Sequence, residues 1–160
     1  MLSEFSVTQK ELKDLTKLWF CSFLEHLNVG GCHRLTDLSP IKGLQRLSWI
    51  DISDTSVADP FTTFSQMSQL TEVQMIGRNG RDDLRELKGA TKLKTLEGAR
   101  TALTGLERTA TSSLREKANV GRYTRVRNLF PFTAFHHNYV GTSFTSIADV
   151  GPLHSFDAPE

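Results

Sequence analysis

The chain contains few of the features that disulfide-rich, membrane-spanning or secreted proteins require. Its 160 residues include two cysteines, which are too few for a disulfide framework and fit a reducing compartment. No apolar run approaches the roughly 18 residues of a membrane span. The N-terminal residues have no basic flank followed by an apolar stretch, so no secretory signal is visible. We therefore expect an intracellular protein, cytoplasmic or nuclear, that does not contact membranes.

An excess of one charge is also missing, because 19 basic and 18 acidic residues give a net charge of +1. No long-range field therefore draws this chain to nucleic acid. The motifs of hydrolases, nucleotide-binding proteins and zinc peptidases are absent from the sequence. Cys21, His26, Cys32 and His33 do not have the spacing of zinc ligand pairs. We expect no enzymatic activity, no cofactor and no metal site.

What the sequence does contain is an apolar pattern that recurs every 23 residues. Four columns keep this spacing over four copies with almost no polar interruption, which is very improbable by chance. The columns are Cys21, Leu44, Met67 and Ala90; Leu24, Leu47, Leu70 and Leu93; Leu27, Ile50, Val73 and Leu96; and Val29, Ile52, Met75 and finally Gly98.

Each copy predicts one strand and one helical turn. The end of the apolar unit alternates apolar and polar residues, as at Ile50 and Ile52, which is typical of a short half-buried strand. Further on, apolar residues three apart, such as Leu38 and Ile41, indicate a helical or 3₁₀ turn. The pattern predicts an α/β fold, a leucine-rich repeat solenoid of about four repeats. A parallel sheet would line its concave face, and helical or 3₁₀ turns its convex face.

The limits of the pattern suggest how the chain is divided. Residues 8–108 are predicted to form the solenoid. Leu12, Leu15 and Leu18 match the convex half of an earlier repeat, whose strand would need residues before position 1. Residues 8–20 are therefore predicted to be a half-repeat or a helical cap. Counting on by 23 places Glu116 and Asn119 in core columns, so residues 109–160 are predicted as a basic linker and an aromatic-rich tail, either a cap or disordered.

The repeat resembles the leucine-rich repeat proteins of trypanosomatid parasites, whose 23-residue unit has a Leu-x-x-Leu-x-x-Leu-Asp-Ile-Ser pattern followed by Thr-Asp-Leu-Ser-Pro-Leu. The corresponding stretches here run from Leu27 to Ile41 and from Ile50 to Val57. The resemblance implies a recognition scaffold without chemistry of its own. The bacterial internalins have a weaker likeness to the same pattern.

The polar positions of the strands predict where a protein partner binds. They form three outward-facing columns on the concave face, and Trp49 in the first is the expected anchor, because aromatic residues contribute much of the binding energy of interfaces. The alternative is that Trp49 only packs on a neighbouring side chain. The predicted partner-binding residues are His26, Trp49, Glu72 and Thr95; Asn28, Asp51, Gln74 and Glu97; and Ser53 and Ile76. We expect the chain to be a monomer that binds a protein of unspecified identity.

Two other functions remain open. Residues 108–127 hold six basic residues against one acidic residue, which suggests binding to nucleic acid or to an anionic surface through phosphate contacts. The chain is alternatively a non-functional fragment of a longer leucine-rich repeat protein, because the pattern ends abruptly.

Overall fold

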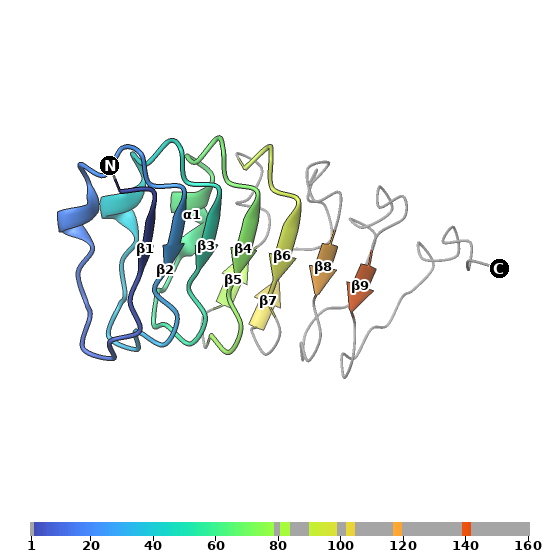
Figure 1. Ribbon diagram of the computed structural model, residues 1–160. Coiled ribbons are helices and arrows are strands. Elements are labelled where there is room, and N and C mark those ends of the chain that lie inside the picture. Colours follow the sequence, from blue (N-terminus) through green and yellow to red (C-terminus); the bar gives the residue numbers. More distant parts are fainter. Residues whose placement is uncertain are drawn as a thin grey trace.

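The computed structural model describes residues 2–78, 81–83, 90–98, 102–104, 117–119 and 139–141, the three-residue stretches by their backbone alone. This part of the chain winds into successive coils, each adding one strand to a seven-stranded parallel sheet (Figure 1). The strands, in their order across the sheet, are β1 (Glu4–Ser6), β2 (His26–Asn28), β3 (Trp49–Asp51), β4 (Glu72–Gln74), β6 (Thr95–Glu97), β8 (Lys117–Asn119) and β9 (Tyr139–Gly141).

The register of the sheet is the register of the apolar columns. Leu27 lies opposite Ile50, Ile50 opposite Val73, and Val73 opposite Leu96. These four side chains are fully buried, whereas their neighbours on either side along each strand are exposed or half-buried. A three-residue strand makes too few contacts to be stable alone, so each strand depends on the coils beside it.

The interior is a stack of apolar layers that the columns supply. Leu24, Leu47, Leu70 and Leu93 are all fully buried, one above the other in successive coils. Burying a leucine side chain stabilises a protein by about 1.5–3 kcal/mol, as an upper estimate. Because only the next coil can cover such a layer, most of the folding free energy lies between coils rather than within them.

The other side of the coils carries short helical turns, as predicted, in the part nearest the N-terminus. These are η1 (Thr16–Leu18), η2 (Ser39–Ile41) and α1 (Pro60–Phe64). In α1 the Asp59 carboxylate accepts a hydrogen bond from the Thr62 amide, and Pro60 occupies the first turn, where its missing N–H costs nothing. Further along, β5 (Arg81–Asp83) and β7 (Ala102–Thr104) pair in parallel as a separate two-stranded sheet.

The prediction that the first strand would lie before position 1 is wrong. Strand β1 pairs with β2 and places Phe5 opposite Leu27, 22 rather than 23 residues away. The missing residue belongs to the turn after the strand, where Val7 to Leu12 is one position shorter than Val29 to Leu35. Residues 8–20 are likewise not a helix, since only η1 is helical there. The first coil therefore has both a strand and a 3₁₀ turn.

The sheet also continues beyond residue 108, where the 23-residue count ended it. Leu96 pairs with Ala118, and Ala118 with Val140, each step again 22 residues long. Counting by 23 placed Asn119 in the core column, one position too far. The other residues of the predicted linker and tail, including most of the basic segment 108–127, lie outside the described residues. No helix within the described part is long and apolar enough to cross a membrane.

The turn column that contains Cys32 is structural. The Cys32 thiol is buried and donates to the Val7 carbonyl at 3.5 Å, and burial raises the pKa of this thiol. In the next coil Thr55 donates to the Ile52 carbonyl at 2.6 Å, and in the third the guanidinium of Arg78 donates to the Val57 carbonyl. Cys21 and Cys32 are both free thiols. In the described part of the chain, no three His, Cys, Asp or Glu side chains gather as a metal site would require.

Aspartates fix the chain where it enters the first two helical turns. Asp14 accepts hydrogen bonds from the amide and hydroxyl of Thr16, at 2.7 and 2.5 Å. Asp37 accepts the equivalent pair from Ser39, both at 2.7 Å. In each case these hydrogen bonds, first that of the side-chain hydroxyl and then that of the amide, lower the pKa of the aspartate below its ordinary value of 3.8.

We predict that these two aspartates make stability depend on pH in acid. A carboxyl whose pKa is lower in the folded than in the unfolded chain stabilises the fold above its unfolded pKa, and this contribution is lost as the pH falls through the folded pKa. The Asp14→Ala/Asp37→Ala variant should therefore melt at a lower temperature than the natural chain at about pH 6, with the difference shrinking toward about pH 2. Thermal unfolding followed by circular dichroism measures both. A difference that stays constant over this range would contradict the assignment.

Candidate partner-binding face

All the sequence-predicted site residues lie on one side of the sheet, which we call the outer sheet face. It consists of the outward-pointing side chains of β1, β2, β3, β4 and β6 and of the residues that directly follow these strands. The strand register aligns the predicted columns as two rows, His26, Trp49, Glu72 and Thr95, and Asn28, Asp51, Gln74 and Glu97. Ser53 and Ile76 come just after the strands and are also adjacent, because the Ser53 hydroxyl accepts a hydrogen bond from the Ile76 amide at 3.0 Å.

Sequence reasoning missed two members of these rows. Glu4 pairs with His26 and Ser6 with Asn28, so both rows extend onto β1. A signal for them was present, because Leu2, Phe5 and Val7 repeat the strand pattern 22 residues before the next copy. A search restricted to a period of 23 could not detect it.

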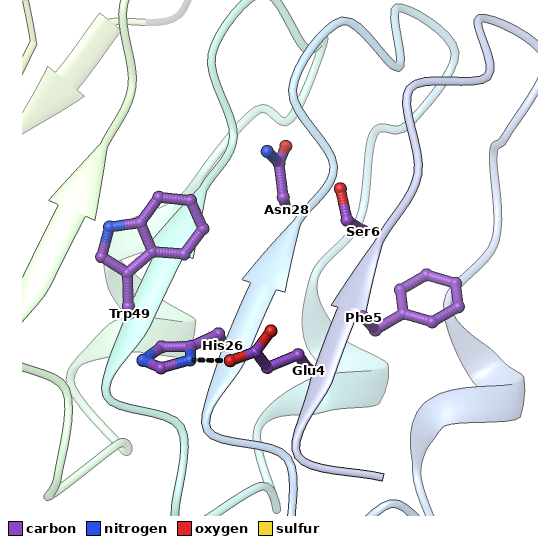
Figure 2. A pocket seen from close by; sticks show the side chains of 6 residues that line it. All are labelled: Glu4, Phe5, Ser6, His26, Asn28 and Trp49. Atoms are coloured by element: carbon purple, nitrogen blue, oxygen red, sulfur yellow. Dashed lines mark hydrogen bonds and ion pairs between the residues drawn. The ribbon is translucent and has the colours of Figure 1, made fainter.

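A shallow hollow of about 370 Å³ opens at the β1 end of the outer sheet face. Figure 2 shows the side chains that line it, with Glu4, His26 and Trp49 following one another across three strands. Phe5 points from the opposite side of β1 and is packed partly against the core. The full lining is Glu4, Phe5, Ser6, His26, Asn28 and Trp49.

Two contacts fix the wall of the hollow. Nδ1 of His26 lies 3.3 Å from Oε1 of Glu4, on side chains that are both well exposed. The rings of His26 and Trp49 meet edge to face, with centroids 6.3 Å apart. Trp49 therefore does pack on a neighbouring side chain, as the alternative interpretation held. It is nevertheless only half-buried and still lines the hollow.

The second row has a structural role that its polarity alone does not reveal. Oδ1 of Asn28 accepts a hydrogen bond from the Gly30 amide at 3.0 Å, and Oδ1 of Asp51 accepts one from the Ser53 amide at 2.8 Å. Both side chains thus hold the chain where it turns away from the strand, as Asx turns do. Changing Asp51 would therefore disturb the fold as well as the face.

Gly30 is required by this arrangement. A Cβ atom at position 30 would lie 2.9 Å from Oδ2 of Asp51 in the next coil, closer than real Cβ contacts come. The carboxylate cannot simply swing away, since its other oxygen is held by the Ser53 amide. Neighbouring coils are therefore fitted to each other at the turns as well as in the core.

Comparison with known proteins finds likeness at the level of structure alone. No family model matches the chain, and a search of curated proteins finds no match either. Among solved structures, internalin C2 of Listeria monocytogenes superposes with a TM-score of 0.73 at 22% identity, over 91% of this chain. The ectodomain of the Arabidopsis thaliana receptor kinase GASSHO1/SCHENGEN3 gives 0.72 at 20% identity over 84% of this chain. A leucine-rich repeat protein of Leptospira interrogans gives 0.69 at 12% identity over 82% of this chain.

These structures confirm the predicted fold, a leucine-rich repeat solenoid. This chain spans 63% of the internalin, 17% of the plant ectodomain and 34% of the Leptospira protein. The likeness therefore covers most of this chain and only part of each of those proteins.

We predict that Gly30→Ala destabilises the fold by about 1 kcal/mol, because the added methyl group displaces the Asp51 carboxylate from the Ser53 amide. Urea unfolding measures the change. Gly43→Ala is the matched control, since a Cβ there meets nothing within 4 Å, and this variant should be as stable as the natural chain or slightly more so. Equal effects of the two substitutions would show that the close approach to Asp51 carries no energy.

Proposed function

We propose that the chain is a monomeric, non-catalytic interaction module that binds a protein partner on its outer sheet face. The observation that carries this proposal is the hollow beside Trp49. A half-buried tryptophan on a sheet face makes no contribution to the stacking of the core, yet it offers a large, rigid contact area to a second molecule.

The rigidity of the face supports the same function. Its side chains stand on strands whose backbone is hydrogen-bonded to both neighbouring coils, for example from the Ser48 amide to the Glu25 carbonyl at 2.9 Å and from the Thr71 amide to the Ser48 carbonyl at 2.8 Å. A preformed face loses little conformational entropy on binding. The Arabidopsis receptor ectodomain of similar fold was solved in complex with CASPARIAN STRIP INTEGRITY FACTOR 2, which is consistent with peptide or protein recognition by this architecture.

The proposal extends to lineage and location. The stretch from Leu27 to Ile41 resembles the repeat of trypanosomatid leucine-rich repeat proteins, and we assign the chain to that group. Its thiols, Cys21 and Cys32, are both free, which favours a reducing intracellular compartment, cytoplasmic or nuclear.

The test compares two tryptophans. Trp49→Ala should weaken binding of the partner captured from the source cells about 30-fold, the effect of losing an interface anchor worth roughly 2 kcal/mol. It should leave the thermal midpoint almost unchanged, because Trp49 lies outside the buried core. Isothermal titration calorimetry on the purified partner and thermal unfolding supply the two measurements.

Trp19→Ala is the matched control. This second tryptophan is 68% exposed and follows η1, away from the sheet. Binding should survive its removal. If instead Trp19→Ala abolishes binding and Trp49→Ala does not, the interface lies on the helical side of the first coil and the proposed face is wrong.

A further inference from the structure

The charges of the outer sheet face have one sign. Along both rows from β1 to β6, the ionisable side chains apart from His26 are carboxylates: Glu4, Asp51, Glu72 and Glu97. No lysine or arginine occupies a row position in these five strands, although the whole chain is nearly neutral. Lys94 comes directly before β6 and outside the rows, and Lys117 continues the first row on β8. The face is thus acidic at the hollow and for three strands beyond it.

The hollow adds an aromatic surface to this negative charge. Trp49 has its edge-to-face contact with His26 on one side, and the register places Glu72 directly beside it on the other. Strands lie about 4.8 Å apart, so Glu72 and Asp51 are within reach of any group seated on the indole. An indole face beside carboxylates attracts a cation, through the ring quadrupole and through charge.

Among cationic side chains, arginine suits this arrangement best. Its planar guanidinium stacks on an indole and donates several hydrogen bonds to carboxylates at the same time, whereas a lysine ammonium is compact and more strongly hydrated. The volume of about 370 Å³ suits one or two side chains of an extended segment. Phosphates and nucleic acid would be repelled by the same carboxylates.

We propose that the outer sheet face recognises an arginine-containing extended segment of its protein partner, with one guanidinium stacked on Trp49 and paired with Glu72. Glu4 holds a second basic side chain at the β1 end of the hollow. This inference rests on the proposed function and names the chemistry of the partner. It requires that binding depend both on the indole and on the carboxylates beside it.

The probes are three fluorescein-labelled peptides of equal length in which serine alternates with arginine, lysine or glutamate. Fluorescence anisotropy with the full chain, at about 50 mM salt to limit screening, gives the affinities. The arginine peptide should bind about fivefold more tightly than the lysine peptide, and the glutamate peptide should not bind. Trp49→Ala and Glu72→Gln should each weaken binding of the arginine peptide about fivefold.

Glu11→Gln is the matched control, since Glu11 is an exposed carboxylate off the outer sheet face that pairs with Arg34 at 2.7 Å. It should leave peptide binding unchanged. Equal loss from Glu11→Gln and Glu72→Gln, or binding of the glutamate peptide, would overturn the proposal by showing unspecific attraction. If the arginine peptide does not bind while capture of the partner still depends on Trp49, the arginine assignment is wrong and the proposed face stands. If capture does not depend on Trp49 either, both fail.

Discussion

Every part of this structure depends on one constraint, namely that the apolar side of a coil can be covered only by the coil beside it. Leu24, Leu47, Leu70 and Leu93 are fully buried because they stand on one another, and no other element is placed to shield them. The three-residue strands inherit their register from this stacking. The outer sheet face follows in turn, because the residues between the inward-pointing ones have no direction left except outward.

Much of the architecture could be read from the sequence, since stacking imposes a period that apolar residues must obey. Leu27, Ile50, Val73 and Leu96 are in register as their 23-residue spacing predicts, and the rows of the outer sheet face follow from it. The period itself was read too rigidly. Pairing between Phe5 and Leu27 requires that strands align, whereas the number of residues in the turn between them is free, so a count fixed at 23 lost strands at both ends.

The candidate site was predictable in position and less so in role. Polarity alone marks Asn28 and Asp51 as outward-facing, but it does not reveal that each also accepts a backbone hydrogen bond two residues further on. The spacing from Asp51 to Ser53 permits such a turn without requiring it. The hollow was not predictable at all, because Glu4 and Ser6 enter it only through pairing of a strand that the period concealed.

The turn after β1, one residue shorter than the next, has a consequence for how such arrays change over evolutionary time. A deletion there leaves the hydrogen bonds of Glu4–Ser6 with His26–Asn28 intact and alters only the corner of the coil. Insertions and deletions in the corners are therefore close to neutral, whereas those within a strand would turn its apolar residue toward solvent. Genes for arrays of this kind can diverge in repeat length while the proteins keep a common sheet, so that sequence kinship fades well before structural kinship does.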